Sequence, residues 1–125
     1  MLVLAKLQQA KELGLVNLLA DENVDVTCLS DFESAYDAVI RQRFGAIWVS
    51  AKDWQDQALV FLQQFLALAP DQLILVFDAD AQLQEQSLEI GAFAVLDSNL
   101  SKSSIRGLMR QIQAFENLSM RRHQA

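Results

Sequence analysis

Five short apolar runs, each followed by a longer segment with helical spacing, constrain the fold of this chain more than any other feature. The runs are rich in branched residues and lie at residues 2–5, 24–29, 46–49, 73–77 and 93–96. Strands that are apolar on both faces and alternate with helices predict a parallel sheet that helices cover on both sides. We therefore expect an α/β protein with the element order (βα)5 and three layers.

The segments between the runs carry helix start and stop signals. We place helices at residues 8–20, 57–67 and 83–90, a further one beginning at Ser30 or Asp31, and a last one beginning after Ser101. Ser30 or Asp31 can cap free backbone N–H groups, Pro70 ends one helix, and Gly91 ends another. In sheets of this kind the functional crevice lies at the carboxyl ends of the strands, so the residues that end each run are the candidate site residues.

Length and charge narrow the class of protein. The 125 residues suffice for one domain with a core and are too few for two. The net charge of −6 is unevenly spread, because residues 1–100 carry 5 basic and 15 acidic side chains while residues 101–125 carry 5 basic and 1 acidic. An acidic body with a basic carboxyl-terminal segment argues against binding of the nucleic-acid backbone as the main activity. We also expect no membrane partner, since the apolar start stops at Lys6.

A single cysteine, Cys28, cannot form an internal disulfide, and no spacing typical of a zinc site is present. These features predict a cytoplasmic protein without a metal or a cofactor.

The order and spacing of three motifs resemble the receiver domain of two-component response regulators over nearly the whole chain. Residues 23–50, NVDVTCLSDFESAYDAVIRQRFGAIWVS, are similar without gaps to the receiver's second strand, second helix and third strand. Gly91-Ala92 is similar to the Gly-Ala lead into its fifth strand, and Ser98-Asn99-Leu100-Ser101 falls where a receiver usually has Lys-Pro-x-Asp. The resemblance implies a flavodoxin-like five-stranded parallel sheet of order 2-1-3-4-5.

The resemblance also implies which positions would carry the phosphorylation chemistry. A receiver uses an aspartate nucleophile after the third strand, two acids that hold Mg²⁺ with it, a hydroxyl, and a lysine that binds the phosphoryl oxygens. The corresponding residues are Ser50 for the nucleophile, Lys6 and Leu7 for the acidic pair, Phe77 or Asp78 for the hydroxyl, and Ser98 for the lysine. Every element is missing, so we predict a degenerate site with no catalytic and no metal-binding residue.

Four aspartates, Asp53, Asp78, Asp80 and Asp97, could still gather near the crevice and attract Lys6, Lys52 or a cation. Acidic residues at strand ends and turns are also ordinary surface chemistry. One hypothesis is that Lys6 forms a salt bridge with a neighbouring acid and so replaces a metal with an internal cation.

The last helix is basic on one side. Lys102, Arg106, Arg110 and Gln113 recur at helical spacing and form one exposed stripe. Glu85 and Glu89 are plausible counterparts on a second copy, which would give an isologous dimer through the face of the fourth helix, fifth strand and fifth helix. The alternative is a solvated helix face.

Two further features are candidates for contact surfaces. Residues 115–125 read as a helical extension beyond a domain at residues 1–114, and Phe115 in that extension is apolar enough to need cover. The extension is either a linker to an output domain or partner, or a frayed end. Trp54 is placed in a loop, where an exposed aromatic commonly anchors an interface.

These observations predict a pseudo-receiver that acts in bacterial signal transduction through protein contacts and is not an enzyme. Two alternatives remain open. One is an atypical receiver that takes part in a phosphorelay with an altered acceptor. The other is a sensor of a small molecule of the quinone type, bound in the vacated crevice, where Leu7, Trp54 and Phe77 would supply apolar walls.

Overall fold

The strands form one parallel sheet. The computed structural model describes residues 1–6, 10–97 and 99–124, and within them five strands pair in the order β2-β1-β3-β4-β5. The strands are β1 (Leu2–Leu4), β2 (Thr27–Leu29), β3 (Ile47–Ser50), β4 (Ile74–Phe77) and β5 (Ala94–Val95). The predicted fold class and strand order are confirmed, with each strand inside its predicted apolar run or one residue beyond it.

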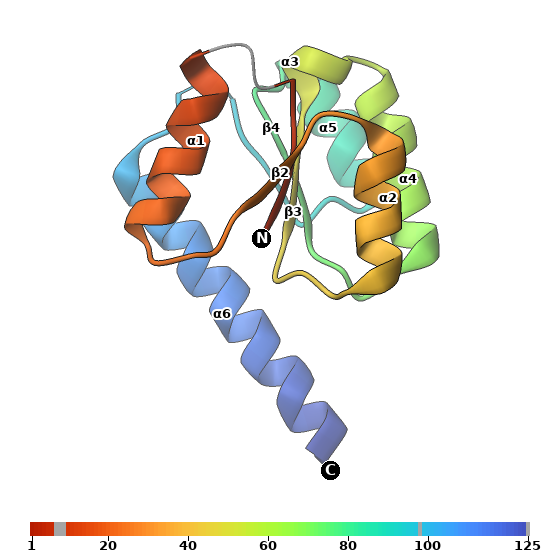
Figure 1. Ribbon diagram of the computed structural model, residues 1–125, viewed down its shortest axis with the longest axis vertical. Coiled ribbons are helices and arrows are strands. Elements are labelled where there is room, and N and C mark those ends of the chain that lie inside the picture. The colour runs from red at the N-terminus through yellow and green to blue at the C-terminus, as the bar shows by residue number, and fades with distance from the viewer. Residues whose placement is uncertain (7–9, 98, 125) are drawn as a thin grey trace.

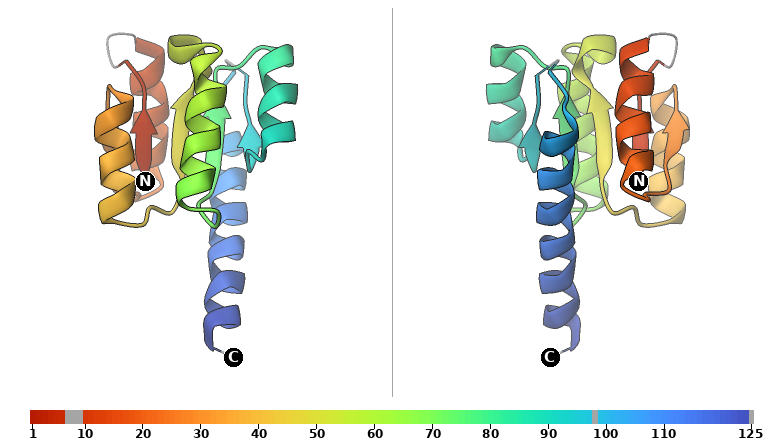
Figure 2. Two further views of the ribbon diagram at one scale, coloured as in Figure 1. Left: turned by 90° about the vertical axis from the view of Figure 1, so that its right-hand side faces the viewer. Right: turned by 90° about the vertical axis from the view of Figure 1, so that its left-hand side faces the viewer.

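Helices cover both faces of the sheet. They are α1 (Ala10–Asp21), α2 (Phe32–Arg41), α3 (Ala51–Trp54), α4 (Gln57–Leu68), α5 (Ala81–Ile90) and α6 (Lys102–Gln124). Figures 1 and 2 show α1 and α6 on one face and α2, α4 and α5 on the other. The predicted signals act at their ends: Asp31 Oδ2 accepts a hydrogen bond from the Ser34 N–H at 2.9 Å, and Gly91 closes α5 with a φ of 129°.

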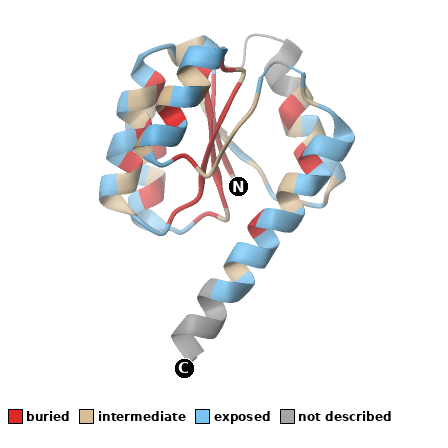
Figure 3. Ribbon diagram, turned by 180° about the vertical axis from the view of Figure 1, so that it is seen from behind, coloured by how far each residue is buried: buried red, intermediate tan, exposed pale blue. Residues whose placement is uncertain are grey.

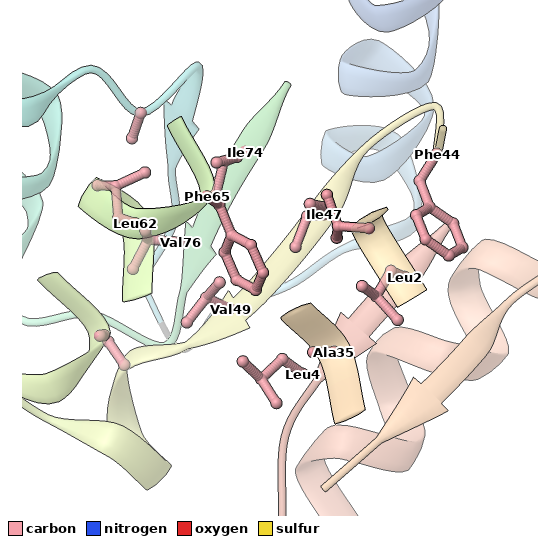
Figure 4. Packing of buried hydrophobic residues seen from close by; sticks show 14 of the residues in the cluster. Leu2, Leu4, Ala35, Phe44, Ile47, Val49, Leu62, Phe65, Ile74 and Val76 are labelled. Carbon is pink, nitrogen blue, oxygen red and sulfur yellow. The ribbon is translucent and has the colours of Figure 1, made fainter. Parts of the chain in front are cut away.

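Two apolar cores result from the alternation of side chains along the strands. Leu2, Leu4, Ile47 and Val49 face α2 and α4 (Figure 4), whereas Val3 and Trp48 face α1 and α6. Figure 3 shows the buried central strands between helices whose outer faces are exposed. Helices therefore cover both faces of the sheet, which explains why apolar and polar residues do not alternate along its strands.

Helix α3 was not predicted, and the placement of Trp54 in a loop is wrong. Trp54 ends α3, which starts directly after β3 with Ser50 as its capping residue. A single turn of four residues is too short to show helical periodicity in a sequence.

Helix α6 continues past the sheet. Phe115 packs edge-to-face on Phe93, with the ring centroids 6.1 Å apart, and Leu118 beyond it is exposed. Figure 2 shows the carboxyl-terminal half of α6 extending away from the sheet. The proposed boundary between residues 114 and 115 falls inside this helix, which runs through it without a break.

In the part of the chain that the structure describes, each helix is too short or too polar to cross a lipid bilayer.

Candidate functional site

Ser50 lies at the carboxyl end of β3, beside Phe77 of β4, in the position where the resemblance implies a phosphoacceptor. The residue is completely buried. Its Oγ accepts a hydrogen bond from the Asp53 N–H at 3.3 Å and caps α3. The hydroxyl is therefore bound to backbone and inaccessible to solvent.

Helix α3 is joined to the end of β1 by three contacts, which we call the α3 tether. Asp53 Oδ2 accepts a hydrogen bond from the Lys6 N–H at 2.7 Å. Trp54 Nε1 donates to the Leu4 carbonyl oxygen at 3.4 Å, and the Lys6 Nζ lies 5.0 Å from the centroid of the Trp54 ring. An ammonium at this distance from an indole face is attracted by the ring quadrupole. The tether lies at the carboxyl ends of β1 and β3, where the resemblance implies a metal site.

The hypothesis of a Lys6 salt bridge needs correction. The Lys6 ammonium contacts the Trp54 ring, and Lys6 meets an acid through its backbone N–H. The ion pairs among the described residues are Arg41–Asp37 and Arg106–Glu22. The Lys6 ammonium therefore contacts the Trp54 ring, and the Lys6 backbone N–H donates to the Asp53 carboxylate on the same short helix.

Phe77 and Asp78 do not supply a hydroxyl. Phe77 is buried in the core that faces α1 and α6. Asp78 follows it in the left-handed region, with a φ of 59°, a conformation that Asp tolerates better than most residues. Leu7 and Ser98, the other two predicted positions, lie outside the described residues.

The acidic residues near the crevice do not form a metal site. Asp80 Oδ1 accepts from the Leu83 N–H and caps α5, and Asp97 Oδ1 accepts from the Asn99 N–H, both at 2.8 Å. Among the side chains that the structure describes, no three of His, Cys, Asp or Glu come close enough to hold a metal ion. Asp53, Asp80 and Asp97 bind backbone N–H groups instead.

An open groove of about 630 Å³ lies between the start of α4 and the start of α5. Its walls include Lys52, Gln55, Asp56, Asp78 and Asp80. Trp54 and Phe77 do not line it, and they pack against cores on opposite sides of the sheet. Of the apolar walls expected for a quinone-type ligand, Trp54 and Phe77 are therefore not brought together, and Leu7 lies outside the described residues.

The basic stripe of α6 is only partly free. Arg106 Nε donates to Glu22 Oε1 of α1 at 3.2 Å, so this guanidinium is paired within the chain. Lys102 and Arg110 are exposed, as are Glu85 and Glu89 on α5. Lys102 and Arg110 on α6, and Glu85 and Glu89 on α5, are thus available to a partner, while their pairing across copies stays a prediction.

Two titratable groups outside the crevice are shifted. Burial raises the pKa of the Cys28 thiol. Burial also lowers the pKa of the Met1 amine, which donates to the Asp25 carbonyl oxygen, while the carboxylates of Asp25 and Glu116 act in the opposite direction. Neither group touches the tether.

No protein-family model and no curated protein matches the chain. Solved structures do match. NtrX from Brucella abortus superposes with a TM-score of 0.79 over 98% of this chain at 15% identity, and a putative response regulator from Chloroflexus aurantiacus J-10-fl with a TM-score of 0.78 over 90% at 14% identity. The chain has the fold of a response-regulator receiver domain. It spans 27% of the NtrX chain and 96% of the Chloroflexus chain.

The receiver domain of NtrX, solved separately, matches with a TM-score of 0.76 at 11% identity over 90% of this chain and 97% of its own. Sequence identities this low show a shared fold, and they do not assign a role to the residues at the crevice.

Sequence reasoning missed the tether, although one signal for it was present. Ser50-Ala51-Lys52-Asp53 has the form Ser-x-x-Asp, a helix-start signature, directly after a strand. In a capping box the acid at the third helical position binds the capping residue's own N–H, whereas Asp53 binds the N–H of Lys6. The helix start was visible in the sequence, and its partner on β1 was not.

Proposed function

We propose that this chain is a receiver-like domain that transmits signals in bacterial regulation through protein contacts, without accepting a phosphoryl group and without catalytic activity. One observation carries the proposal: at the acceptor position, the Ser50 hydroxyl is buried and caps α3. A hydroxyl in this state offers neither a nucleophilic oxygen nor an approach path to a phosphoryl donor.

The surroundings of Ser50 support the same conclusion. A serine becomes a nucleophile only with a base beside it, and the one histidine of the chain, His123, belongs to the distal part of α6. The Lys6 ammonium stands over Trp54 next to the end of β1. A fixed positive charge there disfavours a divalent cation, and hard cations need several oxygen ligands.

The contact surface that we propose is the side formed by α5, β5 and α6. It carries Glu85 and Glu89 on one helix and Lys102, Arg110 and Phe115 on the other, all exposed. The partner would be a protein, an output domain or a second copy of this chain in the cytoplasm. The matched NtrC4 receiver domain was solved as a dimer, and the NtrX chain extends well beyond the matched part.

The test is incubation with acetyl phosphate and Mg²⁺, followed by intact mass spectrometry beside an ordinary receiver as positive control. We expect no added phosphoryl group on this chain. A phosphoryl adduct that disappears in Ser50→Ala would overturn the proposal in favour of an altered acceptor. An adduct that persists in Ser50→Ala would also overturn it and would point to another acceptor residue.

A further inference from the structure

The residue that joins α3 to α4 has an unfavourable backbone conformation. Gln55 has a φ of 50° and a ψ of −126°. Its N–H donates to the Ala51 carbonyl at 2.7 Å and its carbonyl accepts from the Ala58 N–H at 3.0 Å, so the residue closes one helix and opens the next. Residues with a Cβ rarely adopt this combination of φ and ψ, which is favourable mainly for glycine.

The other positive-φ residues apart from glycine in the described ranges are Asn23 and Asp78, each with a φ of 59°. Asn and Asp are enriched at positive φ because their short side chains tolerate it. Gln55 lacks that advantage, which makes its conformation the most costly of the three.

A strained residue persists only where its surroundings hold it in place. Here the neighbouring contacts are those of the α3 tether, together with the edge-to-face contact of Trp54 and Phe61, whose ring centroids are 5.3 Å apart. All of them hold Asp53 and Trp54, the two residues at the end of α3, against β1 and α4. Figure 1 shows α3 above the carboxyl ends of the strands, at the edge of the domain.

We propose that α3 is a latch that the tether holds closed against the strain of Gln55. When the tether breaks, Gln55 relaxes to an ordinary conformation, and α3 turns away from β1 and exposes Trp54 at the crevice. An exposed tryptophan is a strong anchor for a protein contact. The latch goes beyond the proposed function, because it concerns the movement of α3 and Trp54 and not the surface formed by α5, β5 and α6.

The latch can be tested by hydrogen exchange of the two indole N–H groups, which NMR measures on the full chain. Trp54 reports on α3, and Trp48, which is fully buried with its Nε1 on the Met1 sulfur at 3.4 Å, reports on global opening. Gln55→Gly removes the strain of the closed state and is expected to slow the exchange of Trp54 roughly tenfold. Lys6→Ala removes one tether contact and is expected to speed it several-fold, and Lys6→Arg, which keeps a cation over the ring, is expected to restore it.

Asn23→Gly is the matched control, because it makes the same type of change at a positive φ in the turn after α1, away from α3. It is expected to leave the exchange of Trp54 unchanged, because Asn23 keeps the same conformation whether the latch is open or closed. The latch is overturned if Gln55→Gly leaves the exchange of Trp54 unchanged, or if Asn23→Gly slows Trp54 and Trp48 by the same factor. It is equally overturned if Lys6→Ala leaves the exchange of Trp54 at the wild-type rate.

Discussion

At the carboxyl edge of the sheet, polar side chains bind the protein's own backbone, whereas along the exposed side of α6 they face solvent. Ser50, Asp53 and Asp80 each accept from a backbone N–H. On α6, Lys102 and Arg110 are exposed, and Arg106 is paired with Glu22 of α1.

This difference separates residues that stabilise the fold from residues that are available to a partner. Among the three residues at the carboxyl edge, Ser50 is fully buried, and a buried hydrogen-bonded group is costly to replace because its loss leaves another group unsatisfied. An exposed charge contributes little to stability and can change without damage to the fold. The polar groups at the crevice therefore serve to stabilise the fold, whereas the exposed charges on α6 are available to a partner.

The largest expected effect comes from reinstating an acid at the buried edge. Ser50→Asp places a carboxylate at a fully buried position beside Asp53, and we expect a loss of about 3 kcal/mol in the free energy of unfolding at neutral pH. Urea denaturation measures it. Ser103→Asp is the control, since the same change on the exposed first turn of α6 should be neutral or slightly stabilising. Equal stability of Ser50→Asp and the wild type would mean that the edge is not the structural region we describe.

A smaller effect distinguishes two fully buried serines. Ser50 Oγ caps α3, whereas Ser87 Oγ in α5 is the one buried side-chain polar atom without a partner among the described residues. We expect Ser50→Ala to cost about 1 kcal/mol for the lost cap. We expect Ser87→Ala to be neutral or stabilising by up to about 1 kcal/mol, because it removes an unsatisfied hydroxyl. If both variants lose the same stability in denaturant titrations, the cap does not explain Ser50.

The smallest effect on stability is expected on α6. Lys102→Glu with Arg110→Glu should change the free energy of unfolding by no more than about 0.5 kcal/mol, because both side chains are exposed. If the chain forms the proposed dimer, the same pair of changes should weaken it in sedimentation experiments. Adding Glu85→Lys and Glu89→Lys should then restore it by exchanging the signs. If neither set of changes alters dimer formation, the interface lies elsewhere on the chain.

Much of the fold could be predicted because its signals are local. The apolar runs located all five strands, and Asp31 and Gly91 marked helix ends that the structure contains. The strand order came from the resemblance, since parallel strands are joined by crossovers and their neighbours are not encoded locally. Helix α3 was missed because four residues show no period.

The crevice was harder to predict because its contacts join distant parts of the chain. The Lys6 N–H and Asp53 are 47 positions apart, and Trp54 and Leu4 are 50 apart. Nothing near Lys6 in the sequence indicates that its ammonium would find an aromatic ring in place of an acid. The expectation of a salt bridge followed from charge alone, and charge does not specify which face of a neighbouring residue comes within reach.

The sequence by itself determined which side chains follow or end the strands at this edge, because the chemistry of Ser50, Lys6 and Phe77 is a property of the side chains. The tertiary structure decided what these side chains do: one caps a helix, one covers a tryptophan and one fills a core. The physical reason is that burial, hydrogen bonding and ring contacts depend on which distant residues the sheet and its crossovers bring together.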